Sequence, residues 1–152
     1  METSSPPIHA RPPRGAALEL LSRADLPVSD LTEPLLEHFF YVGDATNPSG
    51  LIGVQFCGAD ALLRSLVVSP DARSRGIGSA LVAHAESYAR AKGARAVYLL
   101  TTTAETFFRG RGYERAARDA APLGIRSTAE FSTLCPASSA FLSTEIRDQD
   151  HP

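Results

Sequence analysis

A strand, a loop of arginines and glycines, a helix and a second strand follow one another between residues 61 and 101, and this unit constrains the fold more than any other feature. The apolar run Ala61–Val68 predicts the first strand, and the run Val97–Thr101 predicts the second. A helix ending at Gly93 is predicted between them, because five residues share one helical face: Ile77, Leu81, His84, Ala85 and Tyr88. Two strands joined through a helix need a crossover connection, so we expect them to be parallel.

Antiparallel strands are predicted on both sides of this unit. The apolar runs Phe39–Val42 and Leu51–Cys57 flank a dense cluster of turn residues at 43–50, which indicates a hairpin. Together with the strand at Ala61–Val68 they form a three-strand meander. The other predicted elements are a helix at 17–24 that stops before Pro27, a short helix at Ala104–Arg109 and a last strand at Ser138–Ile146. This order favours an α+β fold with a mixed, mainly antiparallel sheet flanked by helices.

Length and composition exclude several classes of protein. At 152 residues the chain is long enough for one domain, which we place at residues 8–146, with flexible tails at 1–7 and 147–152. The net charge of −2 gives no general attraction to nucleic acid or to a membrane surface, and no run of apolar residues is long enough to span a membrane. Cys57 and Cys135 lack the spacing of a disulfide framework or a zinc site, so we expect no metal and a cytoplasmic location. The oligomeric state stays open, a homodimer included.

The segment between the first strand and the helix carries the chemistry. It reads Ser69-Pro70-Asp71-Ala72-Arg73-Ser74-Arg75-Gly76-Ile77-Gly78-Ser79. Unpaired N–H groups and the positive end of a helix dipole meet there, and glycines let a bulky anion approach the backbone, so the segment fits a phosphate group. The sequence matches neither a P-loop nor a dinucleotide fingerprint, because Leu81 stands where the latter needs glycine. The alternative is a glycine-rich turn with solvated arginines.

The chain resembles the GNAT superfamily of acetyl-CoA-dependent N-acetyltransferases. The resemblance rests on Leu66-Val67-Val68-Ser69-Pro70, then Arg73-x-x-Gly76-x-Gly78, then Tyr98-Leu99-Leu100-Thr101-Thr102, and then Ala104-x-x-Phe107-Phe108-x-x-x-Gly112-Tyr113. It implies acetyl-CoA as co-substrate and a central pair of parallel strands that splay apart to admit it. It also implies that coenzyme A is bound by Leu66, Val67, Val68, Arg73, Ser74, Arg75, Gly76, Ile77, Gly78, Ser79, Thr101, Phe107, Phe108 and Arg111.

Two positions depart from the family pattern. Leu62 stands where many members have a glutamate that accepts the amine proton, and Phe108 stands where many have a tyrosine that protonates the leaving thiolate. We expect catalysis by positioning instead, with the backbone N–H of Val67 stabilising the oxyanion and a water relay through Ser65 and Thr102. Because the usual glutamate and tyrosine are missing, a regulatory protein that binds the coenzyme without turnover is an alternative function. A protein acetyltransferase is a further alternative.

A narrower likeness concerns the substrate, a small-molecule amine. Leu63-Arg64-Ser65-Leu66 and the stretch from Ala129 to Ser138 resemble the small GNAT proteins of arsenic-resistance operons, and Pro122-x-x-x-Arg126 is similar to the domain that makes N-acetylglutamate. Both imply an amino-acid-like amine, in the first case with a role in arsenical or antimetabolite resistance. Arg64 and Arg126 are the candidates to bind a substrate carboxylate. The alternatives are an internal ion pair for Arg64 and a solvated surface position for Arg126.

Overall fold

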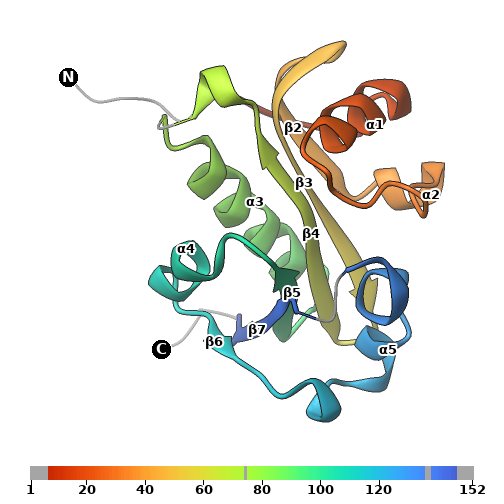
Figure 1. The fold of residues 1–152 in the computed structure, drawn as a ribbon, viewed down its shortest axis with the longest axis vertical. Helices are drawn as coiled ribbons and strands as arrows, with labels where there is room; N and C mark the ends of the chain where they lie inside the picture. The colour runs from red at the N-terminus through yellow and green to blue at the C-terminus, as the bar shows by residue number, and fades with distance from the viewer. Residues whose placement is uncertain (1–6, 74, 136–137, 147–152) are drawn as a thin grey trace. The chain divides into compact units, whose positions relative to one another are not determined.

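A computed structural model describes residues 7–73, 75–135 and 138–146, and within them the chain forms one seven-stranded sheet (Figure 1). The strands are β1 (Ile8–Ala10), β2 (Phe39–Asp44), β3 (Asn47–Cys57), β4 (Asp60–Val68), β5 (Ala96–Thr101), β6 (Glu114–Arg115) and β7 (Ala140–Glu145). Their order in the sheet is β1-β2-β3-β4-β5-β7-β6. The β4–β5 pair is parallel, whereas β1–β2, β2–β3, β5–β7 and β6–β7 are antiparallel. The predicted mixed, mainly antiparallel sheet is confirmed.

The helices follow the predicted pattern where the apolar periodicity is clear. They are α1 (Arg14–Arg23), α2 (Glu33–Leu36), α3 (Ile77–Ala91), α4 (Glu105–Gly110) and α5 (Leu123–Arg126), with 3-10 turns η1 (Pro70–Ala72) and η2 (Arg118–Ala120) and a π-helical turn η3 (Glu130–Leu134). Helix α3 begins at Ile77 as predicted and stops just before Gly93, whose φ of +97° suits glycine.

The described residues divide into two compact units, and β3, β4 and α3 each contribute to both. The first unit holds residues up to 54 and 65–87. Its core packs α1 and α2 against the sheet through Ala17, Leu20, Leu21, Leu31, Leu36, Phe39, Leu51 and Val67. Because neighbouring strand residues point to opposite faces, Leu51 enters this core while Gly50 lies under Ile77 and Leu81 on α3. In this unit, α1 and α3 therefore cover opposite faces of the sheet.

The second unit holds residues 55–64 and the chain from 88 onward. Its core is built from Leu62, Ala121, Ile125 and Phe141, with Cys57, Tyr98, Leu100, Ala116 and Phe131 packed around them. Tyr98 on β5 stacks on Phe141 of β7, with ring centroids 5.6 Å apart. The segment between β6 and β7, which includes α5 and η3, thus covers one face of the sheet in this unit.

The structure differs from the prediction mainly in short elements. The turn between β2 and β3 is only Ala45–Thr46, because the ladder continues through a bulge at Val42/Gly43, where Gly43 adopts φ +95°. Among the strands and α-helices, four short elements were missed: β1, α2, β6 and α5. Each has four residues or fewer, so their local propensity is weak and tertiary pairing holds them, as Ile8 pairs with Val42.

Candidate functional site

The end of β4 and the turn after it are tied together by their own polar groups. The Ser69 N–H donates to the Ser49 carbonyl at 2.8 Å, which extends the contact between β3 and β4 beyond the last residue of β4. The Ser69 hydroxyl lies 2.9 Å from Oδ1 of Asp71, and Nε of Arg73 donates to the Val68 carbonyl at 3.1 Å. The guanidinium of the exposed Arg73 is therefore folded back over the strand end.

Helix α3 presents its N-terminus directly after this turn. The Ala80 N–H donates to the Gly76 carbonyl, so the N–H groups of Ile77, Gly78 and Ser79 precede the first helical hydrogen bond. The first turn carries no acidic side chain, and a Cβ at Gly76 would meet nothing within 4 Å. Gly76 adopts φ +77°, a conformation that glycine takes without strain. Of the predicted anion-binding residues, Ser74 lies outside the described residues.

Gly50 on β3 is a packing contact for helix α3, and the sequence did not predict this role. A Cβ at Gly50 would lie 2.8 Å from Cγ2 of Ile77 and 3.0 Å from Cδ1 of Leu81. The absence of a side chain on β3 thus lets the first turns of α3 approach the sheet closely.

Strand β4 contains a strained residue. Ser65 is buried and adopts φ +63°, in the left-handed region, which costs a non-glycine residue about 1–3 kcal/mol. Beyond it Val67 is buried in the core of the first unit, whereas Leu66 and Val68 are half-buried. The backbone therefore leaves the extended conformation directly before the predicted coenzyme-pairing residues.

The parallel ladder between β4 and β5 is short. It pairs Asp60–Leu62 with Ala96–Tyr98, and both strands continue beyond it, to Val68 and to Thr101. The Thr101 side chain closes the turn into α4, because its hydroxyl accepts from the N–H groups of Thr103 at 3.3 Å and Ala104 at 2.9 Å. Thr102, the predicted proton-relay residue, is exposed.

The two positions that depart from the family pattern are buried hydrophobic residues. Leu62 is completely buried, and Phe108 is 5% exposed. The ring of Phe108 packs edge-on against Phe107 and Tyr113, with centroids 5.0 and 5.3 Å apart. Tyr113 is 1% exposed and therefore belongs to the core.

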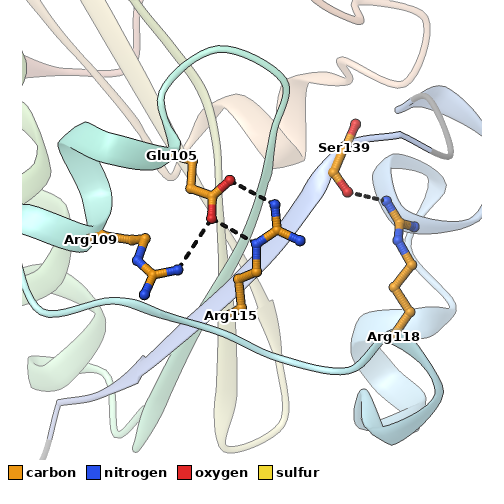
Figure 2. A network of polar contacts seen from close by, with 5 residues as sticks. All are labelled: Glu105, Arg109, Arg115, Arg118 and Ser139. Carbon is orange, nitrogen blue, oxygen red and sulfur yellow. Dashed lines mark hydrogen bonds and ion pairs between the residues drawn. The ribbon is translucent and has the colours of Figure 1, made fainter.

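A surface network fixes α4 to β6 in the second unit (Figure 2). The Glu105 carboxylate accepts from Nε and Nη2 of Arg115 at 2.7 and 2.9 Å, and Arg109 donates to it at 3.4 Å. Hydrogen bonding from Arg115 lowers the pKa of Glu105. Nη2 of Arg118 donates to the Ser139 carbonyl at 2.7 Å, which ties η2 to the start of β7 (Figure 2). The predicted coenzyme ligand Arg111 is half-buried just after α4.

Arg64 belongs to a polar group in which Arg64 and Glu130 are buried and Gln55 and Cys135 are half-buried. Its side chain is fully covered, and Nη2 lies 3.2 Å from Oε2 of Glu130, whose side chain is 6% exposed. Nη1 of Arg64 donates to Oε1 of Gln55 at 3.2 Å, and the Cys135 thiol lies 3.4 Å from Oε1 of Glu130. Burial, reinforced by the Glu130 carboxylate, raises the pKa of Cys135 to about 12, so the thiol is protonated and donates. We call Gln55, Arg64, Glu130 and Cys135 the Arg64 clamp.

The structure does not place the two predicted carboxylate-binding arginines in one hydrogen-bonded group. The internal ion pair that the sequence left open for Arg64 is present, and its contact with a substrate stays a prediction. Arg126 is exposed near the end of α5, and its Nε donates to the Ala121 carbonyl at 3.2 Å. Sequence reasoning missed Glu130. The available signal was the charge of Arg64 inside an apolar strand, which requires a buried partner.

Two other residues that the sequence analysis considered, His84 and Cys57, are in packed or half-buried positions. His84 packs edge-on against Phe40, with ring centroids 4.6 Å apart, as expected for a packed histidine. Cys57 is half-buried, and burial together with Asp60 raises its pKa. Among the residues that the structure describes, no group of three metal-ligating side chains is placed to hold an ion, and no helix is long and apolar enough to cross a membrane.

Comparison with known proteins identifies one family. The model of the acetyltransferase (GNAT) family matches residues 10–115. An amino-acid acetyltransferase of Ectopseudomonas mendocina is 40% identical over 60 residues, which are 40% of this chain and 14% of that protein.

Solved structures with the same fold include two that contain coenzyme A. N-acetylglutamate synthase from Neisseria gonorrhoeae, complexed with coenzyme A and N-acetyl-glutamate, has a TM-score of 0.79 at 21% identity, over 97% of this chain and 36% of that one. Rv2747 from Mycobacterium tuberculosis, in complex with CoA and NLQ, has a TM-score of 0.72 at 17% identity, over 92% of this chain and 99% of that one. The chain thus spans about a third of the gonococcal synthase and a seventh of the curated relative.

Proposed function

Because this chain belongs to the acetyltransferase (GNAT) family, we propose that it transfers the acetyl group of acetyl-CoA to the primary amine of a small, amino-acid-like molecule. The observation that carries the proposal is the N-terminus of α3, whose first N–H groups precede the first helical hydrogen bond and whose first turn has no acidic side chain. Acetyl-CoA carries a pyrophosphate, and a helix N-terminus stabilises such a dianion.

The residues of the first unit fit this co-substrate. The open space at Gly76 leaves the backbone N–H groups of Ile77, Gly78 and Ser79 accessible to a phosphate. Arg73 and Arg75 are both exposed beside them and add positive charge. The backbone of the half-buried residues Leu66 and Val68 is the proposed pairing edge for the pantetheine arm, which would add to β4 like a short extra strand.

The chemistry is assigned to backbone groups and hydroxyls. The amine attacks the thioester carbonyl, the N–H of Val67 donates to the oxyanion that forms, and the thiolate of coenzyme A leaves. The amine proton passes to solvent through a water held by the Ser65 hydroxyl. Leu62 and Phe108 contribute no acid or base. An ordinary thiol has a pKa of about 8.5, so its thiolate leaves without obligatory protonation at neutral pH.

The substrate class rests on similarity and on one exposed arginine. The relative with 40% identity over 60 residues is an amino-acid acetyltransferase, and the fold is similar to that of an N-acetylglutamate synthase. We assign substrate carboxylate binding to Arg126, because this residue is exposed, whereas the guanidinium of Arg64 already meets the Glu130 carboxylate. Acetylation would remove the amine charge of an amino-acid-like arsenical or other antimetabolite, which is the resistance role proposed for a cytoplasmic enzyme of this kind.

The experiment is thiol release from acetyl-CoA against a panel of amines: acidic and neutral amino acids, their phosphinic and arsonic analogues, polyamines and short peptides. We expect release with at least one amino acid or analogue. Tight binding of coenzyme A without turnover on any amine would favour a regulatory coenzyme-binding protein. Turnover confined to peptides would indicate a protein acetyltransferase.

A further inference from the structure

The Arg64 clamp is a costly arrangement that fold stability alone does not explain. Two opposite charges are buried in it, with side-chain exposures of 0% for Arg64 and 6% for Glu130. Arg64 follows the buried apolar residues Leu62 and Leu63 on β4. Buried ion pairs of this kind are often replaced by apolar residues without loss of stability, because removing two charges from water is expensive. In some proteins such a pair is retained because it fixes one particular conformation.

The residue next to Arg64 adopts a conformation that needs to be held. Ser65 has φ +63° inside a strand, where an extended backbone is the relaxed state. A non-glycine residue stays in the left-handed region only when its surroundings fix the backbone on both sides. The other two non-glycine residues with positive φ in the described part of the chain, Arg11 and Asp25, lie outside strands and helices.

The structure supplies an anchor on each side of Ser65. On the N-terminal side, the Arg64 guanidinium is bound to β3 through Gln55 and to the π-helical turn η3 through Glu130, which in turn accepts from the Cys135 thiol. A π-helical turn is rare and is frequent at functional sites. On the C-terminal side, Val67 is buried in the core of the first unit.

We propose that the Arg64 clamp is a positioning device for the acetyl-transfer step: by holding Arg64 it keeps Ser65 in the left-handed conformation and thereby sets the direction of the Val67 N–H. The proposal rests on the proposed function, which gives that N–H the oxyanion. A left-handed residue within a strand rotates the peptide groups that follow it, so the N–H groups after Ser65 leave the regular alternation of the ladder. The clamp acts on kcat, whereas the α3 N-terminus holds the coenzyme.

The test is a double-mutant cycle between the clamp and the strained residue. Glu130→Gln keeps the shape of the side chain and removes its charge. Ser65→Gly supplies a residue that takes φ +63° without strain. We expect Glu130→Gln to lower kcat tenfold or more in the native background, with the coenzyme A Kd changed less than twofold. Ser65→Gly also removes the proposed relay hydroxyl, so Ser65→Ala, which loses the hydroxyl and keeps the strain, is the matched background. Glu130→Gln should lower kcat tenfold or more in Ser65→Ala and less than threefold in Ser65→Gly, because glycine no longer needs the clamp. An equal loss in these two backgrounds would overturn the proposal.

Two further variants separate positioning from stability. Glu19→Gln removes the exposed partner of Arg23 on α1 and is the matched control, for which no change in kcat is expected. The pair Arg64→Met with Glu130→Leu removes both buried charges together, so it should fold even if Glu130→Gln does not. We expect this pair to keep a native Tm and to have a low kcat. Full activity in it would show that the clamp has no positioning role.

A spectroscopic measurement keeps the proposal testable if the native chain acetylates no amine. The amide NMR shifts of Leu66 and Val67 should move in Glu130→Gln and in the Arg64→Met, Glu130→Leu pair, and should stay in place in Glu19→Gln. Unchanged amide shifts in both clamp variants would refute the positioning role of the clamp. Failure of turnover in the native chain, with the shifts moving as expected, would refute the proposed function alone.

Discussion

Replacing Gly50 with alanine should destabilise the fold and weaken coenzyme binding together, because β3 has no room for a methyl group under α3. The new Cβ would lie 2.8 Å from Cγ2 of Ile77, 3.0 Å from Cδ1 of Leu81 and 3.5 Å from the Val67 carbonyl oxygen. Carbon atoms pack at roughly 3.5–4.0 Å, so the Ile77 side chain must shift by about 0.7 Å or more, which is 3.5 minus 2.8 Å, and the Leu81 side chain must shift with it. Overpacking of this kind costs about 1–3 kcal/mol.

The expected effect is measurable by thermal unfolding and by calorimetric titration with coenzyme A. At about 2–4 °C per kcal/mol for a chain of this size, Tm should fall by roughly 2–12 °C. The Kd for coenzyme A should rise as well, since Ile77 opens the helix whose N–H groups bind the pyrophosphate. Gly15→Ala is the matched control, because its Cβ meets nothing within 4 Å and lies in α1, where alanine is favoured by up to about 1 kcal/mol. A native Tm in Gly50→Ala would refute the packing argument.

Further outcomes follow from the same structure. Gly76→Ala, strained at φ +77° but sterically open, should weaken coenzyme A binding more than it lowers Tm; unchanged binding would place the pyrophosphate elsewhere. Arg126→Lys should lower kcat/KM for acidic amino acids about ten- to a hundredfold and much less for neutral amines, because a bidentate charged contact is worth roughly 1.5–3 kcal/mol. The Cys135 thiol, with its pKa raised to about 12, should alkylate slowly up to pH 9, and rapid labelling at neutral pH would contradict its place in the clamp. The lowered pKa of Glu105 means that its pairing with Arg115 stabilises the fold above the ordinary glutamate pKa and is lost as the pH falls through the lowered value; an unfolding midpoint that responds equally to acid in Arg115→Ala would argue against it.

The crossover unit could be predicted because its signals are local. The periodicity from Ile77 onward fixed the start of α3, and the apolar runs before and after it placed β4 and β5 side by side. The anion-binding segment followed from the same stretch, since arginines and glycines at a helix start have a direct physical meaning. The four missed elements are held by partners distant in sequence, which a local pattern does not contain.

The decisive features of the candidate site depend on tertiary structure. Gly50 lay in a cluster of turn residues and was interpreted as part of a turn, although in the structure it is a packing contact for α3. Serine has no strong preference for a left-handed backbone, so the conformation of Ser65 could not be predicted from its identity. The charge of Arg64 demanded a partner, but the chain has 17 acidic residues, and only the fold selects Glu130.

The most direct test of acetyl transfer is to follow the acetyl group itself. The native chain is incubated with acetyl-CoA carrying a carbon-13 label in the acetyl group and with the amine that gives the fastest thiol release, and the products are analysed by mass spectrometry and NMR. We predict one labelled acetyl on the amino nitrogen for each free thiol produced. Label that stays on coenzyme A, or that appears only as free acetate, would contradict the account.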